Sequence, residues 1–215
     1  MDFCEFKCKR IDKKDLWSIA DDFRNTHWPE GTLPINVEKI VEFRLNLLIK
    51  PKRGLFTSID MDAYLEMDLT AIVVDYDFYM NEKHANRLRF SFAHELGHFF
   101  LHKEVFTNFD IRTFADWKNF ILNISDFEYS SFEWQANEFA GRLLVPHSDL
   151  VLAIEQAANI IKENNLIDYL RGQPQILPDA RRSDLVHVQT KIVFGWHIFH
   201  SCKNHSQQQW QSNPF

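Results

Sequence analysis

Two histidines and a glutamate lie at a spacing that suits metal chemistry. His94, Glu95 and His98 fit the pattern H-E-x-x-H within "SFAHELGHFFLH", residues 91–102. On an α-helix, residues four apart lie about 40° apart around the axis and about 6 Å along it, so both imidazoles can reach one ion. Zinc accepts neutral imidazole, and Glu95 can approach a bound water as a general base without being a ligand. The alternative interpretation is a helix whose histidines bind no metal.

A second polar pair provides a candidate third ligand. Glu133 and Asn137, in "FEWQANEFAGRLL", are four apart and share a helix face. Glu133 can complete a three-ligand zinc site, and Asn137 can hydrogen-bond the far nitrogen of a ligating histidine and fix its tautomer. Taken alone, Glu133 is better explained as a solvated charge on an amphipathic helix. No oxyanion donor is evident, because His102, Tyr129 and His147 are each better explained as structural residues.

The composition is that of a globular protein. Of 215 residues, 45% are hydrophobic, and the formal net charge of −6 argues against a protein whose main work is binding nucleic acid. No apolar run is long enough to cross a bilayer, and "MDFCEFKCKR" lacks the apolar core of a signal peptide. We therefore expect a cytoplasmic protein that makes no direct contact with nucleic acid or membrane.

The periodicity of apolar residues predicts which elements position these side chains. Helical spacing predicts helices over residues 12–27, 35–48, 83–101, 130–145 and 147–165. Between Gly54 and Met80, "LFTSI", "AYLEM" and "TAIVVDYDFYM" favour β-structure and predict strands. Residues 103–127 have no sustained period, and the segment after residue 165 fits a helix or a strand.

These elements predict an α+β fold, mainly helical, with a small antiparallel sheet packed on the H-E-x-x-H helix. The expected domain spans residues 1–165, with its core at about 35–165, and residues 166–215 form a C-terminal extension of uncertain structure. The strand "TAIVVD" has two interpretations. It is either an edge strand that pairs with an extended substrate or an ordinary core strand.

The two motifs together resemble a known family. "LRFSFAHELGHFFLH" followed by "EWQANEFAGRLLVP" is similar to the ImmA/IrrE zinc metallo-endopeptidases, whose pattern is H-E-x-x-H and then E-x-x-A-N-x-F-A. The resemblance covers roughly residues 35–165. It implies a gluzincin-like site in which His94, His98 and Glu133 bind Zn²⁺ and Glu95 is catalytic. Asn137 matches the asparagine of the second motif.

The resemblance also implies a regulatory role. Members of the family commonly cleave helix-turn-helix repressors of the Xre type, and we find no room for a full helix-turn-helix domain before the expected sheet. The expected partner is therefore a protein substrate, with any DNA contact made by that partner. A second hypothesis remains open: a zinc-containing protein that binds its regulator without cleaving it, as an antirepressor or a toxin–antitoxin-like component. Glu95→Gln separates the two, since it abolishes function only in a protease.

Overall fold

The computed structural model describes residues 5–163, with side chains described through residue 160. Internal contacts divide the chain into two units, Met1–Leu150 and Val151–Phe215. The predicted C-terminal extension, residues 166–215, lies outside the described residues. No helix among the described residues combines the length and the apolar character needed to span a membrane.

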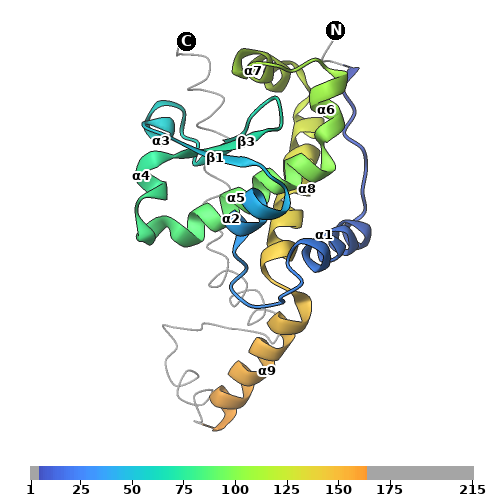
Figure 1. Cartoon of the computed structure of the whole chain (residues 1–215). Helices are drawn as coiled ribbons and strands as arrows, with labels where there is room; N and C mark the ends of the chain where they lie inside the picture. Colours follow the sequence, from blue (N-terminus) through green and yellow to red (C-terminus); the bar gives the residue numbers. More distant parts are fainter. Residues whose placement is uncertain (1–4, 164–215) are drawn as a thin grey trace, which may run out of the picture. The chain divides into compact units, whose positions relative to one another are not determined.

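The elements of the described chain follow one another with short connections (Figure 1). They are α1 (Lys13–His27), α2 (Val37–Lys39), the π-helical turn η2 (Ile40–Arg44), β1 (Leu48–Lys52), α3 (Leu55–Ile59), β2 (Ala63–Leu65), β3 (Ala71–Asp75), α4 (Tyr76–Tyr79), the 3-10 turn η3 (Glu82–His84), α5 (Ala85–Leu101), α6 (Lys103–Asn108), α7 (Phe114–Asn123), α8 (Asp126–Leu144) and α9 (His147–Glu163). The prediction of a mainly helical α+β fold is confirmed.

The sheet is small and mixed, with the strand order β1-β3-β2. β2 pairs antiparallel with β3, as expected, but β1 pairs parallel with it. The parallel pairing is possible because α3 and β2 come between β1 and β3 in the sequence and make the connection long enough to cross over. All five residues of β3 are buried. A strand buried along its whole length is typical of the sheet centre, so "TAIVVD" is the core strand of the two interpretations.

Two predicted elements around the sheet were wrong. "LFTSI" is the helix α3, bounded by left-handed residues Gly54 (φ 74°) and Asp60 (φ 55°). The helix expected over residues 35–48 ends at the π-helical turn, and the chain continues into β1 after Asn46, which has a φ of 54°. β1 was not predicted because it contains Pro51. A central strand excludes proline, but an edge strand such as β1 tolerates it.

Side-chain caps define where the longer helices begin. The Asp12 carboxylate accepts hydrogen bonds from two backbone N–H groups of the first turn of α1. Thr113 and Asp116 form a capping box at the start of α7, in the stretch with no sustained period. Ser125 caps α8, which therefore begins earlier than predicted and ends just before Pro146, as predicted. The segment that carries Glu133 and Asn137 thus lies inside a long helix.

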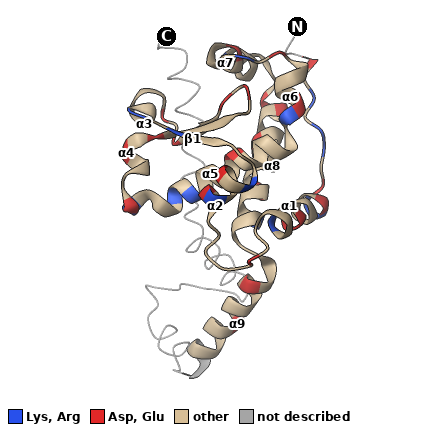
Figure 2. Cartoon of the chain, in the orientation of Figure 1, with Lys and Arg blue, Asp and Glu red and all other residues tan. Residues whose placement is uncertain are grey.

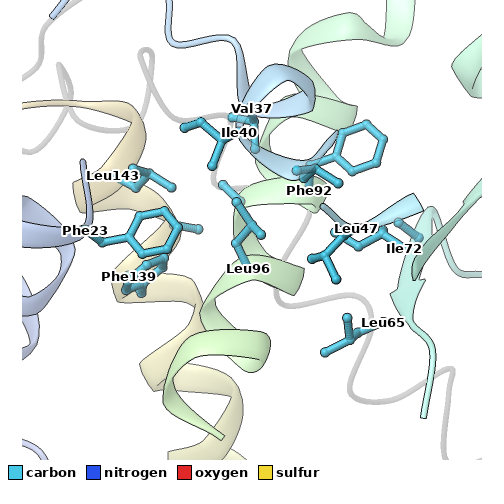
Figure 3. Close-up of a cluster of buried hydrophobic side chains, with 14 of the residues drawn as sticks. Phe23, Val37, Ile40, Leu47, Leu65, Ile72, Phe92, Leu96, Phe139 and Leu143 are labelled. Carbon is cyan, nitrogen blue, oxygen red and sulfur yellow. The ribbon is translucent and has the colours of Figure 1, made fainter. Parts of the chain in front are cut away.

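The core lies on both sides of α5 (Figure 3). Leu96 is fully buried and points from α5 between the helix α8, represented by Phe139, and the sheet, represented by Ile72 and Leu65. On the far side of α8, Phe23 of α1 makes an edge-to-face contact with Phe139, with ring centroids 5.2 Å apart. α5 is therefore enclosed by α8 and the sheet.

The charges on α5 also tie it to the sheet. α5 carries Arg87 and Arg89 in its first turns and one acidic residue, Glu95, in its middle (Figure 2). The Arg87 guanidinium donates two hydrogen bonds, of 2.5 and 2.7 Å, to the carboxylate of Asp62, the residue just before β2. This bidentate pair fixes β2 against α5 close to the H-E-x-x-H residues.

Candidate metal centre

α5 presents the two histidines of the H-E-x-x-H motif on one face. The Nε2 atoms of His94 and His98 lie 3.0 Å apart, as expected for residues four apart on a helix. His98 is buried, and the side chain of His94 is 16% exposed. Two candidate nitrogen ligands are thus placed at the edge of the core, and one of them, His94, is still open to solvent.

α8 brings Glu133 to the same point. Its carboxylate oxygens lie 3.4 Å from His94 Nε2 and 3.6 Å from His98 Nε2. One ligand atom from each of these three residues lies within 4.8 Å of the others, and they are the only such group of three or more found among the described residues. Ligand atoms around a tetrahedral zinc, each about 2.0–2.1 Å from the ion, lie roughly 3.3 Å apart. The donor set and its spacing therefore fit zinc.

The approach of α8 to α5 depends on Gly97. A Cβ at Gly97 would lie 3.0 Å from Cα and 3.1 Å from the carbonyl oxygen of Ala136. These contacts are tighter than normal packing allows, so any larger residue at position 97 would separate the helices. Glu133 is three residues before Ala136 on the same helix. The second unspecified position of H-E-x-x-H, Gly97, thus has a packing role that the motif did not indicate.

Asn137 contacts the far side of the His94 ring. Its Oδ1 lies 2.9 Å from His94 Nδ1. Because an amide oxygen only accepts, the geometry places a proton on Nδ1, so that in the neutral ring the Nε2 lone pair faces His98 and Glu133. The structure therefore brings Asn137 to the position that its spacing from Glu133 suggested.

The ring of His98 is held from behind by a second histidine. His98 Nδ1 lies 3.0 Å from Nδ1 of His102, and His102 Nε2 lies 3.1 Å from Oε1 of Gln135 on α8. Both of these partners are buried. Sequence reasoning had singled out His102 only as a residue better explained as structural, and it had not considered Gln135. The available signal was a third histidine four residues after His98.

Neither of the other two residues considered as oxyanion donors is placed in this group. Tyr129 is partly buried and packs against the hydrophobic core, and His147 is exposed at the start of α9.

The three histidines of this group have very different pKa values. Burial favours the neutral His94 ring, but the hydrogen bond and charge of Glu133 outweigh it and raise the pKa of His94 to about 9. Burial, together with the charges of His94 and His102, holds the pKa of His98 well below its usual value. Burial also lowers the pKa of His102 to about 4. At neutral pH His98 and His102 are therefore uncharged.

Glu95 lies between the histidines and the sheet. Its Oε2 accepts a 2.8 Å hydrogen bond from the backbone N–H of Leu65 in β2. Burial raises the pKa of Glu95 to about 7, although the nearby His94 charge and this hydrogen bond oppose the rise. A carboxyl group with a pKa near neutrality can both accept and return a proton at physiological pH.

Comparison with known proteins agrees with this geometry. Residues 78–171 match the family model of the peptidase M78, IrrE N-terminal-like domain, and this range includes both motifs. This part of the chain is therefore similar to the IrrE N-terminal-like domain. The match supports a function of the metallopeptidase type, as the family resemblance of the two motifs predicted. No curated protein and no solved structure gives a significant match to the chain.

Proposed function

We propose that this IrrE N-terminal-like domain is a zinc-dependent endopeptidase in which His94, His98 and Glu133 bind Zn²⁺ and Glu95 is the general base. The observation that carries the proposal is the meeting of three ligand atoms from two helices. A glutamate that is not one of the three ligands lies next to His94 in the sequence and is itself buried. Asn137 orients His94 through its ring Nδ1.

The protein groups divide the work of peptide hydrolysis among them. Zinc, when bound, polarises the scissile carbonyl and lowers the pKa of water toward neutrality. Glu95 takes a proton from the attacking water and passes it to the leaving amine nitrogen. The Leu65 N–H occupies one carboxylate oxygen of Glu95, which fixes its rotamer and leaves the other oxygen available for the proton.

The edge of β2 provides a place for an extended substrate. β2 is an edge strand of the described sheet, and Glu66 just after it donates its N–H toward β3. Because successive backbone groups alternate in direction, the N–H of Leu65 points to the opposite edge, where Glu95 accepts it. A peptide that pairs along this edge would pass next to Glu95, with affinity from backbone hydrogen bonds.

The proposed substrate is a helix-turn-helix repressor of the Xre type. This proposal is supported by the resemblance of both motifs to regulatory proteases and by the match to a peptidase family. The test is to incubate purified zinc-loaded protein with purified Xre-type repressors, beginning with any encoded beside this chain, and to follow products by mass spectrometry.

The Glu95→Gln variant is the matched control for that assay. Cleavage by the wild type and none by Glu95→Gln is the expected result, with both proteins binding the repressor equally. Binding without cleavage by either protein would replace the proposal with the non-proteolytic binding function. Cleavage by both proteins would rule out Glu95 as the base.

A further inference from the structure

A chain of hydrogen bonds runs from His98 through α8 to the backbone of the N-terminal segment. It begins with His98 Nδ1, 3.0 Å from His102 Nδ1, and continues from His102 Nε2 to Gln135 Oε1 at 3.1 Å. The Gln135 amide nitrogen then donates to the backbone carbonyl of Lys9 at 2.6 Å. No buried side-chain nitrogen or oxygen among the described residues lacks a partner, so the chain is complete.

The far end of this chain determines the direction of every bond in it. The Lys9 carbonyl can only accept, so the NH₂ group of Gln135 must face it and Oε1 must face His102. Because Oε1 can only accept, His102 Nε2 carries a proton. In a neutral His102 ring the other nitrogen, Nδ1, is then an acceptor, and His98 Nδ1 must donate to it.

The surroundings of His102 favour the neutral ring. Its side chain is 5% exposed, Gln135 is 1% exposed, and the ring stacks on Phe132 with centroids 4.1 Å apart. Neither ring nitrogen contacts a carboxylate. A charged imidazolium in such an apolar place, with no anion at either nitrogen, would be costly. With the proton of His98 on Nδ1, its Nε2 lone pair faces Glu133 and His94.

The N-terminal segment that carries the Lys9 carbonyl is itself fixed to α8. The buried Glu128 carboxylate accepts a 2.8 Å hydrogen bond from the Cys8 N–H. It also accepts bonds of 2.9 and 3.0 Å from the Arg10 guanidinium. These bonds hold the backbone on both sides of Lys9, and so the acceptor at the end of the chain cannot easily move away from Gln135.

We propose that His102 and Gln135 are positioning residues that hold His98 in its Nδ1–H tautomer, so that Nε2 is presented to the metal. This inference rests on the proposed zinc site. The two ligating histidines are then oriented by different hydrogen-bond partners. His94 uses the amide of Asn137 directly, whereas His98 uses a buried histidine whose own tautomer is set by Gln135.

Two substitutions of His102 separate its hydrogen bond from its bulk. The amide of asparagine lies close to where a histidine has Nδ1, so His102→Asn retains an acceptor for His98. The longer His102→Gln places its amide near the Nε2 position and leaves His98 Nδ1 without that acceptor. We expect His102→Gln to lower the affinity for Zn²⁺, measured by competition with a chelator, by about 10–100-fold. His102→Asn should remain close to the wild type.

The tautomers are measured directly by ¹⁵N NMR of the imidazole rings in zinc-free wild-type protein. The expected result is Nδ1–H on His98 and Nε2–H on His102. An Nε2–H tautomer on His98 would overturn the inference, as would equal losses of zinc affinity in both variants, which would indicate packing alone. The wild-type spectrum decides the matter even if a variant fails to fold.

The same experiments distinguish this inference from the proposed function. Zinc binding by the wild type with the wrong tautomer on His98 would overturn only the role of His102 and Gln135. No zinc binding by the wild type, even after reconstitution, would overturn the zinc site and with it the reason for orienting His98.

Discussion

Replacing Gly97 by alanine tests whether the close packing of α5 on α8 builds the site. The new Cβ would lie 3.0 Å from Ala136 Cα and 3.1 Å from its carbonyl oxygen, against about 3.5–4.0 Å for comfortable carbon contacts. Since both neighbours are backbone atoms, the helices must separate by several tenths of an ångström. Overpacking of this kind costs about 1–3 kcal/mol of the free energy of unfolding.

Gly141→Ala is the matched control, because Gly141 also lies in a helix but has nothing within 4 Å of an added Cβ. Any glycine-to-alanine change within a helix gains about 0.5–1 kcal/mol through backbone entropy and helix propensity. That gain is common to both variants, so their difference isolates the clash. We expect Gly97→Ala to be less stable than Gly141→Ala by about 1–3 kcal/mol.

The assay is urea unfolding of both variants in zinc-free buffer, followed by zinc titration. Gly97→Ala should also bind zinc more weakly than the wild type, because moving α8 displaces Glu133 relative to His94 and His98. Gly141→Ala should bind zinc as the wild type does. Equal unfolding free energies for the two variants would refute the argument that Gly97 is required by helix contact.

Three further predictions concern pH, the orientation of His94 and the N-terminal segment. In the metal-free protein the pKa of His94 is about 9, so below this pH zinc must displace its proton, and lower pH weakens binding. Zinc affinity, measured by competition with a chelator, should therefore rise about tenfold per pH unit between pH 7 and 8 and level off above pH 9. An affinity that does not change from pH 7 to 8 would contradict this. Asn137→Ala removes the acceptor at His94 Nδ1 and should reduce the zinc affinity about 10–100-fold in the same chelator competition. An unchanged affinity would mean that Asn137 does not orient the ring. Glu128→Gln weakens the hydrogen bonds from Cys8 N–H and Arg10 and should lower the free energy of unfolding in urea by about 1–3 kcal/mol. An unchanged midpoint of urea unfolding would show that these bonds do not hold the N-terminal segment.

The sequence predicted most reliably what depends on local spacing. The long amphipathic helices α1, α5 and α9 were predicted because their apolar residues repeat over several turns. α7 was missed for want of such a period, although its capping box at Thr113 and Asp116 is a local signal that could have located it. The predictions for the segments that form α3 and β1 were wrong because the conformation of a short segment depends on the residues around it. For α3 these include the left-handed residues before and after the helix.

In the candidate site, too, local spacing was predictable and contacts between distant residues were not. The spacings of His94 with His98 and of Glu133 with Asn137 are properties of single helices, so each pair could be recognised in the sequence. The contact of His102 with Gln135 joins residues 33 positions apart and depends on how α5 and α8 pack. No spacing rule predicts such a contact. The same holds for the Leu65 N–H at Glu95, which depends on the register of β2.

The most direct test of the central claim is the zinc content per chain of protein purified without added metal. Elemental analysis compares the wild type with Glu133→Ala and Glu95→Gln, each shown to be folded. The account predicts about one zinc in the wild type and in Glu95→Gln and clearly less in Glu133→Ala, since Glu133 is a ligand and Glu95 is not. Wild-type protein without zinc, even after reconstitution, would contradict the proposed site, and equal zinc in all three proteins would remove Glu133 from it.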